Sequence, residues 1–190
     1  MRNVAGLTLR GMTGAAVEVE AEITGGMPTF AVVGLPDTAV KEARERVRAA
    51  LRTVNVLLRG RVSVNLAPAD LPKEGAMLDL PIAVALAEKA GRVRTERPAL
   101  YIGELALDGR LRGVRGAVPA AFFARENNME LFVPPENAAE VSIVEGVRAW
   151  SVPDLQSLVM HLRGEKSLET IEKREIECAA PAADPDFFRN

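Results

Sequence analysis

The sequence predicts a mixed α/β fold on three observations. Apolar residues recur at every second position in residues 17–23, which is typical of a half-buried strand. They recur at helical spacing after Asp37, and a second, strongly apolar helix is expected after the turn-rich segment 65–78. The chain has 190 residues, of which 48% are hydrophobic. This is enough for one well-buried domain with a short extension.

Residues 17–23 and 30–35 are expected to form a β-hairpin that turns at Gly25-Gly26. A helix then begins at residues 36–38, where the side chain of Asp37 or Thr38 can accept hydrogen bonds from the free N–H groups of the first turn. Its apolar positions follow helical spacing and predict one buried side. These positions are Ala39, Val40, Ala43, Val47, Ala50, Leu51 and Val54.

The rest of the chain continues the alternation of strands and helices. Pro81 falls in the first turn of a helix, where it removes no hydrogen bond, and Asp108-Gly109 predicts a tight turn. The charged, then Ala- and Pro-rich residues 166–190 predict a linker or disordered tail after a domain of residues 1–165. The further expected elements are strand 61–66, helix 79–90, strand 99–107, helix 116–127, strands 129–133 and 147–152, and helix 154–162.

The composition argues against several classes of protein. No apolar run approaches the roughly 20 residues that span a bilayer, and residues 1–15 lack a signal-peptide core, so a cytoplasmic chain is expected. The net charge is −2, so any DNA-binding surface must be a local patch. Cys178 and His161 are the only residues of their types, and no metal site is expected.

The motifs of nucleotide-binding and hydrolytic enzymes are missing. Residues 34–41 come nearest to G-x-x-x-x-G-K-[ST], but they lack the second Gly and the final Ser or Thr. The chain is therefore expected to bind no ATP by itself. A Ser-His-Asp triad would need His161, which is better explained as a surface or interface residue of the last helix. The alternating Glu18, Glu20 and Glu22 predict the solvent-facing side of a strand.

Residues 65–86 have the layout of a catalytic site without its nucleophile. A turn-rich run leads into a helix that opens at Asp79, which would present a side chain at the helix start. Ala76 and Met77 occupy the positions where a nucleophile would lie, and residues 65–90 contain no Ser, Cys or Thr. This pattern indicates a catalytic fold that is kept for another purpose.

Residues 34–51, 65–86 and 102–121 resemble, in order and spacing, the N-terminal domain of the ComM/YifB family. Those proteins are often described as magnesium-chelatase-like AAA+ ATPases. The resemblance covers roughly residues 1–165. It implies that a P-loop ATPase domain would follow, with residues 166–190 as the linker that leads to it.

The same domain resembles the proteolytic domain of Lon protease, which implies a two-layer α/β sandwich with a mixed sheet. Lon uses a Ser–Lys dyad, in which the deprotonated Lys activates the Ser. Residues 73–79 are similar to Lon's serine-bearing segment and put Met77 at the serine position. The segment after residues 103–105 puts Val118, or Ala120 in a shifted register, at the lysine position. The resemblance therefore implies a pseudo-protease with no catalytic residue.

Two basic groups are candidates for DNA contact. One lies opposite the apolar side of the first helix, and the other follows the Asp108-Gly109 turn. Such groups would contact phosphates without reading sequence, so binding would be weak and salt-sensitive. The alternative is a solvated face or a subunit contact, because Glu45 and Arg48 are spaced for an ion pair within the helix. The candidates are Lys41, Arg44, Arg48 and Arg52 in the first group and Arg110, Arg112 and Arg115 in the second.

The resemblance implies a part of a hexameric, ATP-driven DNA motor that promotes branch migration in natural transformation and homologous recombination. This domain would organise the ring through its own AAA+ domain and neighbouring subunits. ATP and magnesium would belong to the full-length protein, and no membrane partner is expected. Two alternatives remain, a Lon-like peptidase with a relocated dyad of Ser63 and Lys73, and a magnesium-chelatase-type metal-insertion subunit.

Overall fold

The structure, a computed structural model, describes residues 4–11 and 13–173. The expected tail beyond Lys173, with Cys178, lies outside the described residues. The strands are β1 (Val4–Arg10), β2 (Thr13–Thr24), β3 (Thr29–Val33), β4 (Arg61–Ala67), β5 (Ala99–Tyr101), β6 (Glu104–Leu105), β7 (Leu111–Arg112), β8 (Glu130–Val133), β9 (Arg148–Ser151) and β10 (Glu169–Thr170). The helices are α1 (Thr38–Thr53), α2 (Asp79–Lys89), α3 (Ala117–Glu126), α4 (Ala138–Val141) and α5 (Leu155–Leu162), with the 3-10 turns η1 (Ala76–Leu78) and η2 (Pro135–Asn137).

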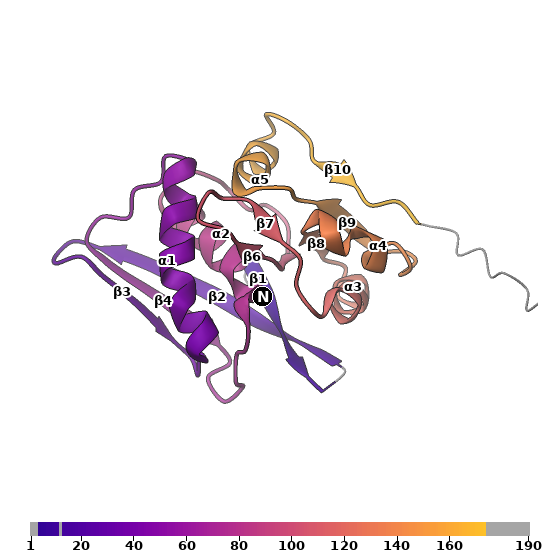
Figure 1. The fold of residues 1–190 in the computed structure, drawn as a ribbon, viewed down its shortest axis with the longest axis horizontal. Coiled ribbons are helices and arrows are strands. Elements are labelled where there is room, and N and C mark those ends of the chain that lie inside the picture. The colour runs from indigo at the N-terminus through magenta and orange to yellow at the C-terminus, as the bar shows by residue number, and fades with distance from the viewer. Residues whose placement is uncertain (1–3, 12, 174–190) are drawn as a thin grey trace, which may run out of the picture.

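One mixed sheet of eight strands forms the centre of the domain, in the order β10-β9-β8-β5-β1-β2-β4-β3 (Figure 1). Strands β1, β5, β8 and β9 are parallel neighbours. Strand β2 is antiparallel to both β1 and β4, and β3 is parallel to β4 at the edge. Strands β6 and β7 form a separate two-stranded ribbon. The predicted α/β sandwich with a mixed sheet is therefore confirmed.

The predicted hairpin between residues 17–23 and 30–35 is wrong. Strand β2 pairs with β1 on one side and with β4 on the other, so no edge of β2 is left for β3. Strand β1 was not predicted from the sequence. Its first five residues are all buried, both those on one face of the strand and those on the other. A strand covered on both faces shows no alternation of polar and apolar residues.

The predicted strand 99–107 is split into β5, which joins the main sheet, and β6, which pairs with β7. The break lies at Gly103, where a Cβ would be 2.9 Å from Leu111 Cδ2 and 3.1 Å from Pro134 Cγ. The chain can bend this closely past both side chains only without a side chain of its own. The predicted turn at Asp108-Gly109 is present and joins β6 to β7.

Helix α1 begins and packs as predicted. The Asp37 carboxylate accepts a hydrogen bond from the backbone N–H of Val40 at 2.7 Å, which caps the helix. The predicted apolar side is buried except for Ala39, which is half-buried. This side packs against α2, η1 and β3, so the opposite side of α1 is left to face solvent.

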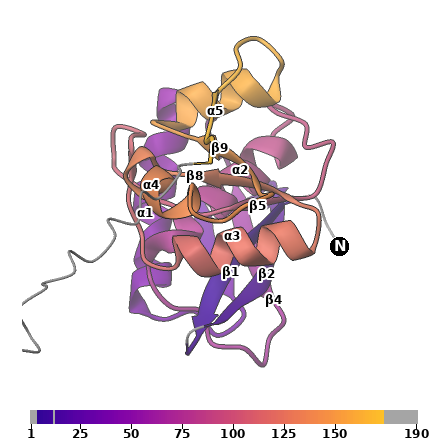
Figure 2. The same cartoon turned by 90° about the vertical axis from the view of Figure 1, so that its right-hand side faces the viewer.

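Helices cover both faces of the sheet. A Cβ on Gly6 would lie 2.5 Å from Leu78 Cδ2 and 2.9 Å from Pro81 Cγ, so this residue faces the start of α2. Leu9 lies three residues after Gly6 in β1, so its side chain points to the opposite face of the sheet. There it packs against Gly116 at the start of α3. Helix α3 therefore lies across the sheet from α2, and Figure 2 shows it in front of β1 and β2. It adds a partial third layer to the sandwich.

The outer side of β2 faces solvent, as predicted. Glu18 and Glu20 are half-buried, and Glu22 is exposed and pairs with Lys89 at 2.9 Å. The domain also continues past residue 165, because β10 pairs with β9 and Ile171 packs against the core. None of the helices in the described part of the chain is long and apolar enough to cross a membrane.

Candidate functional site

The nucleophile-free segment lines a hollow between the start of α1 and the loop after β7. We call it the Met77 hollow, and its volume is about 500 Å³. Its wall includes Asp37, Gly75, Met77, Glu104 and Arg115. Among the described residues that line it, none is Ser, Thr or Cys. Its described lining therefore offers no hydroxyl or thiol for nucleophilic attack.

Hydrogen bonds to the start of α1 hold this segment in place. The second carboxylate oxygen of Asp37 accepts from the N–H of Gly75 at 3.0 Å. The backbone of Lys73 pairs with this region twice, because its N–H donates to Leu35 O at 3.1 Å and its carbonyl accepts from Asp37 N–H at 3.0 Å. Asp37 therefore fixes both the first turn of α1 and the approach to α2.

Lys73 is fully buried, and its ammonium group donates to the carbonyl of Pro68. Burial lowers the pKa of Lys73, and the nearby Asp70 carboxylate opposes this shift. Ser63, the other residue of the alternative dyad, lies in β4 opposite Glu22. Among the side-chain hydrogen bonds of residues 4–11 and 13–173, none joins Ser63 to Lys73. The contacts of Lys73 thus explain it as a structural residue.

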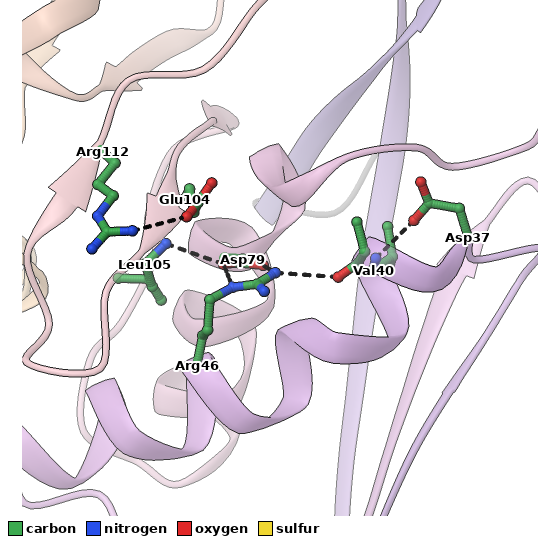
Figure 3. A network of polar contacts seen from close by, with 8 residues as sticks. Asp37, Val40, Arg46, Asp79, Glu104, Leu105 and Arg112 are labelled. Carbon is green, nitrogen blue, oxygen red and sulfur yellow. Dashed lines mark hydrogen bonds and ion pairs between the residues drawn. The ribbon is translucent and has the colours of Figure 1, made fainter.

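A buried ion pair joins α1 to α2. Arg46 donates from Nε to Asp79 Oδ2 at 2.6 Å and from its terminal nitrogen to Oδ1 at 3.1 Å (Figure 3). Leu105 N–H donates to the same carboxylate at 3.1 Å. Asp79 is fully buried, whereas the Arg46 side chain is 21% exposed. Burial raises the pKa of Asp79, while the hydrogen bonds from Arg46 and Leu105 favour its charged form.

This pair was not predicted from the sequence, although the sequence contains a signal for it. By spacing alone, Glu42 could pair with Arg46, because it lies four residues earlier on the same helix. Asp79, however, is the only charged residue in the apolar run 76–87, all of which from residue 77 onward is buried. A carboxylate in such a run requires a partner. Arg46 is next to Val47 on the buried side of α1, which makes it the basic residue best placed to provide one.

Met77 and Val118, the positions that the resemblance gives to the lost dyad, line different hollows. Met77 is buried at the Met77 hollow. Val118 lies in α3 and lines a hollow of about 560 Å³ with Phe122 and Phe123. Ala120, the alternative position, is fully buried. The structure therefore does not bring the two expected positions to a single hollow, and neither side chain can carry a proton.

The four basic candidates on α1 have different environments. Lys41, Arg44 and Arg52 are exposed, whereas Arg48 is half-buried. The Arg48 guanidinium lies 5.8 Å from the centre of the Phe30 ring, at a distance typical of a cation–π contact. Arg44 Nε is 3.6 Å from the carboxylate of its neighbour Glu45, and both side chains are largely exposed, so the pair is weak.

The second basic group is partly neutralised. Arg110 pairs with Asp108 at 2.8 Å, and Arg112 approaches Glu104 at 3.5 Å. Arg115 is exposed and lines the Met77 hollow. This group therefore carries less free positive charge than its sequence indicates.

The second basic group lies beside α1, on the side of the helix that carries Arg46 and Thr53, whereas Arg48 of the first group lies over Phe30 of the edge strand β3. Gly109 contacts the end of α1, where a Cβ would lie 2.9 Å from Thr53 Oγ1. At the start of α1, Arg115 and Asp37 line the same hollow. The segment from β6 to Arg115 therefore approaches α1 near its last turn and again near its first. Figure 1 shows β6 and β7 side by side, with α2 between them and α1. We call the two groups together the α1 basic surface, formed by Lys41, Arg44, Arg48, Arg52, Arg110, Arg112 and Arg115.

The described residues also limit the metal chemistry of this part of the chain. Within residues 4–11 and 13–173, no group of three or more His, Cys, Asp or Glu side chains is arranged to hold a metal ion. Two of the carboxylates that line the Met77 hollow, those of Asp37 and Glu104, have other partners. Asp37 caps α1, and Glu104 lies beside Arg112.

Comparison with known proteins finds one matching family and several relatives of similar sequence. Residues 19–137 match the family described as subunit ChlI of Mg-chelatase. The YifB protein of Salmonella typhimurium is 39% identical over 180 residues, which are 93% of this chain and 35% of that protein. Competence protein ComM of Haemophilus influenzae is 38% identical over 161 residues, 83% of this chain and 32% of its own. The chain thus spans about a third of the length of these relatives.

The family match includes the segments that build the candidate site. Residues 34–51, 65–86 and 102–121, on which the resemblance was based, all lie within residues 19–137. They form α1, the Met77 hollow with α2, and the ribbon of β6 and β7 with the start of α3. The match extends over more than half of the chain. The chain therefore belongs to the family of subunit ChlI of Mg-chelatase, as a member of its ComM/YifB type.

Proposed function

We propose that this chain is the non-catalytic N-terminal domain of a hexameric AAA+ DNA motor. The motor promotes branch migration during natural transformation and homologous recombination. In this role the domain organises the ring and contacts DNA through the α1 basic surface. ATP and magnesium bind the ATPase domain of the full-length protein, and this chain supplies neither site.

The observation that carries the proposal is the α1 basic surface. Two basic groups that are far apart in the sequence flank α1, on a molecule whose net charge is −2. Lys41, Arg44 and Arg52 are exposed there. Such a patch attracts the phosphate backbone without reading bases, which suits a motor that must move along any sequence. Competence protein ComM, a relative by sequence, has a name consistent with this role.

The Met77 hollow supports the non-catalytic part of the proposal. A Ser–Lys dyad needs both members, because the amine must remove the proton of the hydroxyl. Met77 offers no hydroxyl, and Val118 lines a different hollow. The polar groups around Met77 instead hold the fold together, since Asp37 and Asp79 both accept structural hydrogen bonds.

The proposal is tested with the full-length protein on a four-way DNA junction with fluorescently labelled arms. ATP and magnesium should produce branch migration. The Arg44→Glu, Arg52→Glu double variant should slow migration while the protein still forms rings in mass photometry. A parent protein that does not move the junction would contradict the motor assignment. Loss of rings in the double variant would instead assign the α1 basic surface to subunit contact.

A second candidate follows from the family description, which names a magnesium chelatase subunit. In this candidate the chain would assist metal insertion. The part of the chain that the structure describes contributes no metal-ligand cluster to such a role. Magnesium titration of the chain separates the two candidates, because the DNA-motor proposal expects no saturable magnesium binding by residues 1–190.

A further inference from the structure

A third hollow lies at the end of α5, lined by none of the residues of the α1 basic surface or the Met77 hollow. Its walls come from residues 94–97 after α2, from Tyr101 and Glu130 in the sheet, and from residues 161–164. Its volume is about 430 Å³. This size falls in the range of roughly 300–1,000 Å³ that is usual for small-molecule sites. We call it the Tyr101 hollow.

Three arginines line this hollow from two segments of the chain. Arg94 is exposed and forms no ion pair with the described residues. Arg97 is 3.7 Å from the Glu130 carboxylate, beyond hydrogen-bond distance, and its side chain is 69% exposed. Arg163 donates from Nε to the carbonyl of Arg92 at 2.7 Å, which holds its guanidinium at the end of α5. The hollow is therefore bordered by guanidinium groups, the side chains best suited to bind phosphate.

A buried hydroxyl group forms part of the wall. Tyr101 is 1% exposed, yet it lines the hollow. Its ring stacks on Phe132 with centroids 4.8 Å apart, which fixes its direction. Burial raises the pKa of Tyr101, so the hydroxyl stays protonated and can donate.

His161 adds another donor to the same wall. The N–H of Leu168 donates to His161 Nδ1 at 3.1 Å, so the neutral ring carries its proton on Nε2. Burial lowers the pKa of His161, which keeps the ring neutral at pH 7. Contacts with Phe132 and Trp150, at 5.6 and 4.7 Å between ring centroids, hold the ring in place.

Two carboxylates also line the hollow, and a third, that of Glu165, lies 3.8 Å from the Arg163 guanidinium. Glu130 lies beside Arg97, and Glu96 is exposed. The wall itself holds three guanidinium groups. Arg94 is the guanidinium of this wall without an ion pair among the described residues, and both neutral side chains described above are donors. An acceptor-rich anion therefore fits this wall better than a cation or an apolar ligand.

We propose that the Tyr101 hollow binds a phosphate group through Arg94, Arg97 and Arg163, with hydrogen bonds from the Tyr101 hydroxyl and His161 Nε2–H. A phosphate offers several acceptor oxygens around one centre, which matches donors that come from the loop, the sheet and α5. Two sources provide this chemistry, a small soluble phosphate compound and the terminal phosphate of a nucleic-acid strand. The site goes beyond the proposed DNA contact of α1, because it lies on different elements.

The first test is titration of the chain with inorganic phosphate at constant ionic strength, followed by ¹H–¹⁵N NMR. Saturable shifts should be confined to the amides of residues 94–97 and 161–164. Arg94→Ala should weaken binding about tenfold or more, because it removes a charged donor. Tyr101→Phe keeps the ring and should weaken binding by about two- to tenfold, the usual effect of one neutral hydrogen bond. Arg125→Ala, a matched change on α3, should bind like the parent.

The proposal is overturned if phosphate causes no saturable shift in the parent, or if Arg94→Ala and Tyr101→Phe bind as well as the parent. Arg94 is exposed, so Arg94→Ala should keep the fold. It therefore still tests the proposal if Tyr101→Phe fails to fold. Competition with oligonucleotides then identifies the source. A 5′-phosphorylated strand that displaces phosphate, when the 5′-hydroxyl strand does not, assigns the site to nucleic-acid ends. If neither strand competes, the site binds a small soluble phosphate.

Discussion

Arg46 and Asp79 make a two-point ion pair in which the carboxylate is fully buried. The N–H of Leu105 donates to the same carboxylate. One side chain therefore joins α1, α2 and the β6–β7 ribbon. Because α1 carries the first basic group and the ribbon begins the second, this pair also fixes the arrangement of the α1 basic surface.

Replacement of Arg46 by Met is expected to lower the free energy of unfolding by about 3 kcal/mol, because it leaves the Asp79 charge buried without a partner. Urea denaturation measures the loss. The double variant Arg46→Met, Asp79→Asn should recover part of it, because no buried charge remains. A loss below about 1 kcal/mol in the single variant would mean that the pair acts like an exposed salt bridge.

The variant Met77→Ser is expected to show no peptidase activity. Neither Val118 nor Ala120 can take the proton from a hydroxyl at position 77, so the new side chain would stay unreactive. Unfolded casein and a fluorophosphonate probe measure activity and labelling. Met77→Ala is the matched control, because it makes a similar cavity without a hydroxyl. Labelling of Met77→Ser alone would show that a base lies nearby after all.

Stability is expected to fall as the solution is acidified from about pH 7 to pH 5. Burial lowers the pKa of His161, so the unfolded chain takes up a proton before the folded chain does. The stability that the neutral ring contributes is complete above its ordinary pKa of about 6.5 and is lost as the pH falls toward the lowered value. His161 is the only histidine, so urea denaturation of His161→Phe should show a flatter profile in this range. The same slope in both proteins would exclude His161 as the cause.

Local sequence patterns predicted most elements of the fold but not how the strands pair. The helical spacing in α1 and the Asp37 cap depend on neighbouring residues, and both were confirmed. The hairpin prediction failed because the partner of β2 depends on β1, whose buried residues give no alternating pattern. Gly103 ends β5 because of contacts with Leu111 and Pro134, which are distant in the sequence.

The contrast between local patterns and contacts of distant residues also explains which parts of the sites could be predicted. The basic residues of α1 are visible as a local charge pattern, but the approach of Gly109 to Thr53, which joins the two groups, is a tertiary contact. The Tyr101 hollow could not be predicted at all. Its residues come from a loop, two strands and the end of α5, and no spacing in the sequence links Arg94 to Arg163.

The central claim, that the α1 basic surface contacts DNA, is tested most directly by binding of residues 1–190 to a four-way junction and a linear duplex at about 50 mM salt. The parent should bind weakly and without sequence preference. The Arg44→Glu, Arg52→Glu variant should lose at least about tenfold in affinity, and the slope of log affinity against log salt should fall by about 2. The charge-matched control Arg125→Glu, Arg148→Glu, on α3 and β9, should bind like the parent. Junction binding by the α1 variant that equals that of the parent would contradict the claim.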